Sequence, residues 1–240
     1  MPNKLFLNLH LMKIKRLPKY FIFSLITILL MIAMAFMMPS PKRVVFFGDS
    51  ITQMGAERGG YIDLMRDMLK AKNQEGEFEL TGAGIGGNKI YDLYLRLDDD
   101  VLTKQPDIVF IFIGVNDVWH KTWGTGTDAD KFEQFYTAVI HKIKASGAEV
   151  ILCTPAVIGE RTDFSNSLDG DLNKYSGIVR RLAEEEKCTL LDLRAKFLKY
   201  NLNHNPRNLE KGILTTDGVH LNPTGNKLVA DAMIEVLLGH

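Results

Sequence analysis

The sequence predicts an α/β domain built on a parallel sheet of about five strands. Short apolar runs alternate with longer amphipathic segments throughout residues 41–240, and this alternation is typical of βαβ units. Some of these runs are apolar at nearly every position, which indicates strands that are covered on both faces. The first three strands lead into turns rich in Gly, Ser or Asn. No internal repeat or linker interrupts this segment, so we expect one domain over 41–240.

The first predicted strand is the apolar run 44–47, which leads directly into Gly48-Asp49-Ser50. In open α/β sheets the working groups lie at the carboxyl ends of the strands, and Ser50 stands at such an end. We therefore interpret Ser50 as a nucleophile, although a serine at this place in isolation would more often cap a helix. A serine nucleophile needs a base, a group that orients the base, and donors for the oxyanion. Asp49 is expected to brace the turn.

The next elements are predicted from hydrophobic spacing and from glycine-rich breaks. Glycines follow Ser50 in a loop, and apolar residues then recur at helical spacing. The run after Asp107 is apolar for six residues and is the clearest strand, expected at the centre of the sheet. In order, the predictions are a helix at about 61–72, a short strand at 78–81, a glycine-rich turn at 82–88, a helix to about residue 97, and a strand at 107–113.

The second half of the chain continues the alternation. Pro155 ends the fourth strand, and Asn222 followed by Pro223 is a typical helix start. The predictions are a loop at 118–127, a helix at about 128–146, a strand at 150–154, a loop at 156–170, a helix at about 171–186, a strand at 189–193, a short helix at 194–200, an irregular segment at 201–214 and a last helix at about 223–238.

Polar residues at the ends of the strands and before the last helix form a candidate catalytic set. Asn116 and Asp117 follow the third strand, and Asp117 is expected to cap a turn. Asp217 and His220 precede the last helix with a spacing of three. One turn can therefore direct both side chains to the same place, where Asp217 would hold the His220 imidazole in the tautomer that leaves one nitrogen free as a base.

With these blocks in view, the sequence resembles the SGNH or GDSL-type hydrolases. The resemblance covers about residues 43–238. Four blocks in the family's order carry it: Gly48-Asp49-Ser50, the glycine-rich turn that ends at Gly87, Gly114-Val115-Asn116-Asp117, and Asp217-Gly218-Val219-His220. The resemblance implies a flavodoxin-like three-layer sandwich, in agreement with the alternation of strands and helices.

Carried over residue by residue, the resemblance implies a triad and an oxyanion hole. Ser50 would be the nucleophile, His220 the base and Asp217 the acid that orients it. The N–H groups of Ser50 and Gly87 and the side-chain amide of Asn116 would bind the oxyanion. The sequence departs from the family at position 82, where a glycine stands in place of the frequent asparagine; we expect this to remove a bracing hydrogen bond without affecting the chemistry.

Other functional classes have weaker support. The spacing of His, Cys, Asp and Glu gives no metal motif, so no metal or other cofactor is expected. The glycine-rich turn does not have the spacing of a dinucleotide fingerprint, and no acidic residue stands where a ribose would be bound. His120 is a candidate substrate contact. Trp119 and Trp123 are interpreted either as an aromatic wall for a sugar or acyl chain or as packing residues.

The first 40 residues resemble a targeting segment. They carry a net charge of +5, and the uncharged apolar stretch 21–38 follows the basic residues. Such a stretch is either a signal peptide, with a small-x-small cleavage site at 33–35, or a membrane anchor at the lower length limit. Both interpretations place the remaining domain outside the cytoplasm, as a periplasmic, extracellular or membrane-anchored protein. Residues 41–240 have a net charge of −5, which gives no reason to expect a nucleic acid partner.

Export would permit a disulfide, but the sequence argues against one. Cys153 is predicted late in one strand and Cys188 early in the next, so parallel neighbours would hold the two cysteines roughly 10 Å or more apart at ~3.3 Å per residue. We expect two buried thiols.

The sequence therefore predicts an exported serine esterase that hydrolyses short-chain esters, most naturally acetyl esters on a carbohydrate or another small molecule. A lysophospholipase or thioesterase and an acyltransferase with the same triad remain open as alternatives. A binding relative without catalysis is a third alternative, although such a protein would not need the full set of Ser, Gly, Asn and His.

Overall fold

The computed structural model describes residues 20–21, 24, 27–28 and 40–239. The α/β unit begins at Pro41. No helix in the described part of the chain has the length and apolar character needed to cross a membrane. The segment 21–38, for which the sequence predicts a leader or an anchor, lies mostly outside the described residues.

Five parallel strands form one sheet in the order β2-β1-β3-β4-β5. This is the flavodoxin-like order, in which the topology switches between β1 and β3 and opens a crevice at the carboxyl edge. The predicted fold is confirmed. The strands are β1 Lys42–Gly48, β2 Phe78–Gly84, β3 Ile108–Phe112, β4 Glu149–Cys153 and β5 Thr189–Leu191.

The register of the strands aligns the carboxyl ends of β1 to β4. Gly48 at the end of β1 pairs with Gly84 of β2 and with Phe112 of β3. Phe112 in turn pairs with Cys153 of β4. The turns that follow these residues therefore lie side by side along the carboxyl edge of the sheet, as the sequence predicts.

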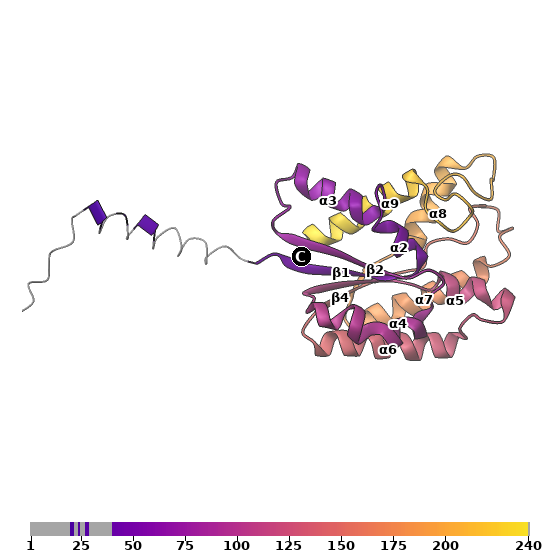
Figure 1. Cartoon of the computed structure of the whole chain (residues 1–240). Helices are drawn as coiled ribbons and strands as arrows, with labels where there is room; N and C mark the ends of the chain where they lie inside the picture. The colour runs from indigo at the N-terminus through magenta and orange to yellow at the C-terminus, as the bar shows by residue number, and fades with distance from the viewer. Residues whose placement is uncertain (1–19, 22–23, 25–26, 29–39, 240) are drawn as a thin grey trace, which may run out of the picture. The chain divides into compact units, whose positions relative to one another are not determined.

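Helices cover both faces of the sheet and make three layers (Figure 1). On one face lie α2 Ser50–Gly55, α3 Tyr61–Ala71, α8 Leu193–His204 and α9 Pro223–Leu238. On the other lie α4 Ile90–Asp100, α6 Ala129–Ala145 and α7 Asp169–Glu185. The short helices are η1 Leu102–Lys104 after α4, then α5 Val115–Trp119 and η2 His120–Trp123 after β3.

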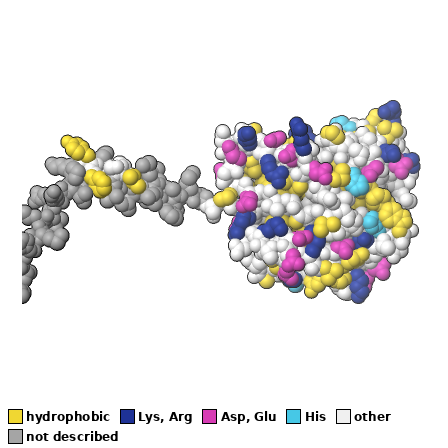
Figure 2. Space-filling view, in the orientation of Figure 1, with side chains coloured by type: hydrophobic (Ala, Val, Ile, Leu, Met, Phe, Trp, Pro, Cys, Tyr) yellow, Lys and Arg dark blue, Asp and Glu magenta, His cyan; other side chains and the backbone are white. Residues whose placement is uncertain are grey.

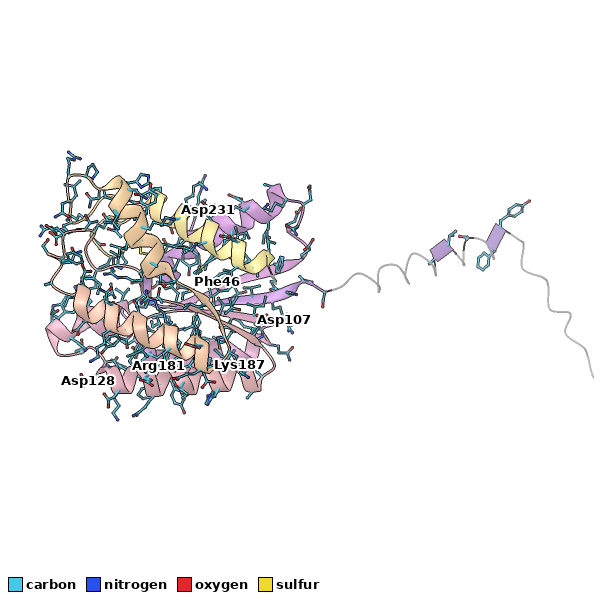
Figure 3. The ribbon with its side chains drawn as sticks, turned by 180° about the vertical axis from the view of Figure 1, so that it is seen from behind. Phe46, Asp107, Asp128, Arg181, Lys187 and Asp231 are labelled. Atoms are coloured by element: carbon cyan, nitrogen blue, oxygen red, sulfur yellow. The ribbon has the colours of Figure 1, made fainter. Side chains whose placement is uncertain are left out.

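The sheet separates two hydrophobic cores because successive side chains of a strand point to opposite faces. Phe46 and Phe110 belong to the core under α3 and α9, and their rings stack with centroids 5.0 Å apart. Figure 3 shows Phe46 between the sheet and α9. Phe47 and Val109 belong to the core under α4, α6 and α7. On the face shown in Figure 2, basic and acidic side chains are interspersed.

Two predictions near the first strands were wrong in their boundaries. The segment after Ser50 is helix α2 and not a loop, because the Asp49 side chain accepts a hydrogen bond from the N–H of Ile51 and caps a short helix. The glycine-rich segment continues strand β2 to Gly84. A Cβ at Gly84 would lie 2.1 Å from the backbone nitrogen of Gln53, so its lack of a side chain lets β2 pack against α2.

Two further segments are more helical than predicted. The expected loop at 118–127 begins with the end of α5 and continues as η2. Helix α8 runs through the first residues of the segment predicted to be irregular and ends at His204. Its weak amphipathic pattern conceals it in the sequence, and a capping hydrogen bond from the Ala195 N–H to Asp192 starts it.

The prediction of two unpaired cysteines is confirmed. Cys153 and Cys188 are free; Cys153 is buried as expected, whereas Cys188 is only half-buried, which corrects the prediction of two buried thiols. Cys153 pairs in the ladder with Leu191, three residues beyond Cys188, so the strand register separates the two thiols. Burial raises the pKa of both thiols, that of Cys153 far more.

Candidate active site

Ser50 stands at the switch point of the sheet, as the first residue of α2. The turn from β1 into α2 is tight because Gly48 has no side chain: a Cβ there would lie 2.4 Å from the carbonyl oxygen of Phe112. The N–H of Ile51 donates to Asp49 at 2.9 Å, so Asp49 braces the turn as predicted. The Ser50 side chain is thereby held at the carboxyl edge.

His220 and Asp217 approach Ser50 from the segment that precedes α9. Ser50 Oγ lies 3.0 Å from His220 Nε2, and His220 Nδ1 lies 2.7 Å from Asp217 Oδ2. A carboxylate only accepts hydrogen bonds, so Nδ1 carries the proton and Nε2 is free to accept the proton of the Ser50 hydroxyl. The structure therefore brings together the three residues that the sequence singles out, in the order serine, histidine, aspartate.

The Asp217 carboxylate is oriented by its own turn. Its Oδ1 accepts the N–H groups of Val219 and His220 at 3.0 and 2.8 Å, and its Oδ2 accepts the imidazole. Partial burial opposes ionisation, but these hydrogen bonds outweigh it and lower the pKa of Asp217 below its ordinary value. Asp217 is therefore ionised at neutral pH and keeps the ring in one orientation.

Two backbone N–H groups of the residues around the site have no acceptor in the described part of the chain. Within the described residues, the N–H groups of Ser50 and Gly87 donate to no acceptor, whereas that of Gly86 donates to Gln53 Oε1 at 2.7 Å. Gly87 has a φ of +77°, a left-handed conformation that favours glycine. Among the glycines of this turn, Gly87 is therefore better suited than Gly86 to donate to a bound oxyanion.

Asn116 is tied to the segment that follows Gly87. Its side-chain amide donates to the carbonyl of Asn88 at 3.1 Å, which leaves one of the two amide hydrogens available. The adjacent Asp117 accepts the N–H of Ile90 at 3.2 Å. Asp117, which was expected to cap a turn, instead accepts at the start of helix α4 from another element, and the two contacts fix α5 against the Gly87 turn.

Asp49 and Asp117 form a pair of buried carboxyl groups behind the site. Burial, together with the charge of Asp117, raises the pKa of Asp49 to about 7 despite the Ile51 hydrogen bond. Burial likewise raises the pKa of Asp117 to about 6. Asp117 Oδ2 is buried and has no hydrogen-bond partner at ordinary distance and angle among the described residues. The nearby Thr127 hydroxyl nevertheless lowers the pKa of this carboxyl group.

Arg96 of α4 is a structural residue of the site that sequence reasoning missed. Its guanidinium donates to Asn88 Oδ1 at 2.7 Å, to the carbonyls of Gly48 and Ala83 at 2.8 and 3.0 Å, and to Asp100 at 2.7 Å. It therefore joins the ends of β1 and β2 to the turn that carries Gly87. The sequence shows only an arginine on an amphipathic helix, so it contains no signal of this role.

The departure from the family pattern at Gly82 has a steric reason. A Cβ at this position would lie 2.8 Å from the Cβ of Ala56. A residue with a side chain would thus push β2 away from the segment that follows α2.

The aromatic residues of α5 and η2 lie next to the Gly87 turn. A Cβ at Gly87 would be 4.0 Å from the ring carbon Cε1 of His120, so His120 borders the donors described above. Partial burial and the nearby Lys89 ammonium lower the pKa of His120. Trp119 packs partly against the core, whereas Trp123 is 61 % exposed. The sequence left the roles of the two tryptophans open; Trp119 contributes to packing, whereas Trp123 is left exposed beside His120.

Two cavities flank the Asp217–His220 turn, and neither includes Ser50 in its lining. The larger, about 730 Å³, runs along α3 and is mainly apolar, with Met54, Leu64, Met68 and Leu221 among its lining residues. The smaller, about 470 Å³, is mainly polar and includes Trp119 and Asp217. The described residues contain no cluster of three or more His, Cys, Asp or Glu side chains that could hold a metal ion.

A family model gives the broadest comparison with known proteins. Residues 46–228 match the model of the GDSL-like Lipase/Acylhydrolase family. The matched segment contains all the site residues described above.

Individual relatives agree with the family model. The crystal structure of the acetyl xylan esterase AlAXEase is 61 % identical in sequence, with a TM-score of 0.80, and the match covers 81 % of this chain and 99 % of that one. The acetylxylan esterase of Geobacillus stearothermophilus is 28 % identical over 213 residues, which are 81 % of this chain and 93 % of that protein. An uncharacterized lipoprotein of Bacillus subtilis is 26 % identical over 217 residues, 79 % and 87 % of the two chains.

Solved variants of the Geobacillus stearothermophilus enzyme identify its catalytic residues. Three of its crystal structures are of catalytic mutants, in which a serine, an aspartate and the histidine three positions after that aspartate are each replaced by alanine. These structures match this chain with 26–27 % identity and TM-scores of 0.71–0.72, and each match covers 82 % of this chain and 94 % of the other.

Proposed function

This chain belongs to the GDSL-like lipase/acylhydrolase family and is an esterase that acts on acetyl esters, and on that premise we propose that Ser50, His220 and Asp217 are its catalytic triad. The observation that carries the proposal is the continuous hydrogen-bonded chain from Ser50 Oγ through the imidazole to Asp217. The serine, aspartate and histidine of the relative's catalytic mutants support it, because the spacing of three between aspartate and histidine is the same here.

The reaction has two steps, each with one proton transfer through His220. In the first, Ser50 Oγ bonds to the ester carbonyl carbon while its proton moves to Nε2. The bond to the alcohol oxygen then breaks, and that oxygen takes the proton from Nε2. In the second step a water molecule attacks the acyl-enzyme with the same histidine as base, which releases the acid and restores Ser50.

The negative charge of both tetrahedral intermediates would be bound by three donors. We assign them to the N–H groups of Ser50 and Gly87 and to the free amide hydrogen of Asn116. The absence of competing acceptors for both N–H groups within the described residues supports this assignment. Donors that are already oriented stabilise the developing charge without reorganisation, which is a large part of the rate acceleration in acyl transfer.

The proposed substrate is an acetylated carbohydrate, with xylan as the leading candidate. The names of the two acetylxylan esterases support this. We further propose that residues 1–40 export the domain from the cytoplasm, in agreement with their basic and apolar composition and with the lipoprotein relative.

The decisive experiment compares the wild-type protein with Ser50→Ala on acetylated xylooligosaccharides and on p-nitrophenyl acetate, together with labelling by a fluorophosphonate probe. We expect stoichiometric labelling of the wild type, acetate release by it, and neither in Ser50→Ala. A folded wild-type protein that the probe does not label would instead favour the binding relative without catalysis.

A longer acyl chain is the second candidate, and the apolar cavity along α3 favours it. Met54 lies one turn beyond Ser50 in α2, and Leu221 directly follows His220, so this cavity begins near the site. A series of p-nitrophenyl esters from acetate to decanoate separates the candidates. A kcat/KM that falls beyond the shortest chains supports the acetylesterase, and one that rises supports a lysophospholipase or thioesterase.

A further inference from the structure

We propose that the polar cavity beside the Asp217–His220 turn, together with the ring surface of α5 and η2, binds a neutral oligosaccharide chain whose esterified sugar lies at Ser50. This inference deepens the proposed function and rests on it for the position of the ester. It adds the place where the rest of the sugar chain is recognised, so it predicts that the protein distinguishes an oligosaccharide from a single sugar.

The cavity and the site share the Asp217 turn. Asp217, Gly218 and Val219 line the cavity on one side, and Trp119 and Thr122 line it on another. The neighbouring His120 reaches the Gly87 turn. A chain that presents its ester to Ser50 can therefore continue over η2 into the cavity.

The rings of α5 and η2 provide the apolar part of such a site. His120 and Trp123 have ring centroids 4.8 Å apart, and those of Trp119 and Trp123 are 5.4 Å apart. Trp123 is 61 % exposed. An exposed indole contributes little buried area to the stability of the fold, but its apolar face is available to contact a ligand. The C–H faces of sugar rings are apolar and flat enough to stack on such rings.

The cavity itself supplies hydrogen-bonding groups of both kinds. Arg161 and Glu210 form an ion pair at 3.2 Å at its wall, and Asn166 and Ser165 add an amide and a hydroxyl. Sugar hydroxyls both donate and accept, and they match such a mixture. Arg161 is the one basic residue in the lining, and it is balanced by Glu210 and Asp217, which favours a neutral ligand over an anionic one.

The cavity is held open by hydrogen bonds between its two loops. The N–H of Gly159 donates to the carbonyl of Gly218 at 2.8 Å. The fully buried Glu160 carboxylate accepts the N–H groups of Ile213 and Leu214 at 2.8 and 2.6 Å. A wall that is ordered before binding loses little entropy when a ligand enters, and about 470 Å³ is within the usual range for small-molecule sites, roughly 300–1,000 Å³.

The test uses the tryptophans as reporters. Trp119 and Trp123 are the only two in the 240-residue chain, so intrinsic fluorescence reports on this surface alone. We expect a saturable fluorescence change when unsubstituted xylotetraose is added to the purified full chain, and none with the same concentration of xylose. Calorimetric titration gives the affinity independently of the fluorophores.

Four variants test the contacts. Trp123→Ala and Arg161→Ala should each weaken xylotetraose binding by about 2–10-fold and should lower kcat/KM for acetylated xylotetraose more than for p-nitrophenyl acetate. Leu202→Ala is the matched control for Trp123, with the same 61 % exposure on α8. Arg181→Ala is the control for Arg161. Arg181 lies on α7 (Figure 3), is half-exposed, and forms an ion pair with Glu133 of α6. Both controls should leave binding unchanged.

The outcomes separate this inference from the proposed function. Suppose that acetate release depends on Ser50, but that xylotetraose does not bind or that test and control variants have equal effects. This result overturns the oligosaccharide site and leaves the esterase intact. In the opposite case, Trp123→Ala and Arg161→Ala weaken xylotetraose binding, but Ser50 does not react. This result supports the oligosaccharide site and overturns the triad.

Discussion

Single residues at the carboxyl edge differ in whether their polar groups are already used. The Gly86 N–H is occupied by Gln53, whereas those of Gly87 and Ser50 have no acceptor in the described part of the chain. Asn116 keeps one amide hydrogen for a ligand because the carbonyl of Asn88 takes the other. These differences support the proposed assignment of the oxyanion donors.

Asn116→Ala tests the side-chain donor. We expect kcat to fall by roughly 10²–10³-fold with little change in KM, because the lost hydrogen bond forms fully only in the transition state. Steady-state kinetics on p-nitrophenyl acetate measure this. Asn201→Ala is the control, since Asn201 is equally buried in α8. Near-normal turnover in Asn116→Ala would remove Asn116 from the oxyanion hole.

Asp49→Asn tests the buried carboxyl behind Ser50. Burial raises the pKa of Asp49 from 3.8 to about 7, so between these values the folded state keeps a proton that the unfolded state has released. The stability from this group is complete below pH 4 and is lost as the pH rises toward 7. The difference is at most about 4 kcal/mol at 1.36 kcal/mol per pH unit.

Asparagine keeps an acceptor for the Ile51 N–H but does not titrate. We therefore expect the free energy of unfolding of Asp49→Asn, measured by urea denaturation from pH 4 to 8, to fall less with rising pH than that of the wild type. Parallel curves for the two proteins would contradict the raised pKa.

Between elements, the junction of β1, β2 and α4 decides where the Gly87 turn lies. Arg96 makes this junction through two strand carbonyls and the Asn88 side chain, and its guanidinium also stacks on Phe47 at 4.6 Å. Since the Asn88 carbonyl accepts a hydrogen bond from Asn116, we expect Arg96 to be a positioning residue for the proposed oxyanion donors.

Arg96→Ala tests this role against Arg194→Ala. Arg194 is likewise an arginine with several hydrogen bonds and a largely covered side chain, but it lies on α8 and contacts Asp169 and Asn173. Both variants should lose about 3–5 kcal/mol of stability, because each leaves buried partners unpaired. Only Arg96→Ala should also have a lower kcat, and added guanidinium ion should restore part of that kcat. An equal loss of kcat in both variants would reduce Arg96 to a structural residue.

The whole molecule places its stability in two cores and its chemistry at one edge. Phe110 lies in the central strand, is fully buried, and stacks on Phe46 within the core, two positions before the Gly48–Phe112 pair at the carboxyl edge. Stability and catalysis should therefore respond separately to substitutions in the cores.

Phe110→Ala tests this separation. The cavity it leaves should lower the free energy of unfolding by about 3–5 kcal/mol, as measured by urea denaturation. The kcat at a temperature where the variant is fully folded should stay within about twofold of the wild type. A large loss of kcat with normal stability would show that the core and the edge are coupled.

The sequence by itself determined the fold class and singled out the three residues that we propose as the triad. Strand–helix alternation is a local property of hydrophobic spacing, and a parallel sheet brings its strand ends to one edge whatever the details. Ser50, Gly87 and Asn116 could therefore be assigned to that edge from their positions after apolar runs. The three-residue spacing of Asp217 and His220 is equally local.

Only the tertiary structure decided which groups around these residues are free, buried or charged. Helix α2 and the extension of β2 depend on the approach of Gly84 to Gln53, which joins segments 31 residues apart. The contacts of Arg96 and Glu160 and the wall of the cavity beside Asp217 depend on hydrogen bonds between segments that lie still farther apart in the sequence. Hydrophobic periodicity records which face of an element is buried, but it contains no information about which distant carbonyl or carboxylate a side chain meets.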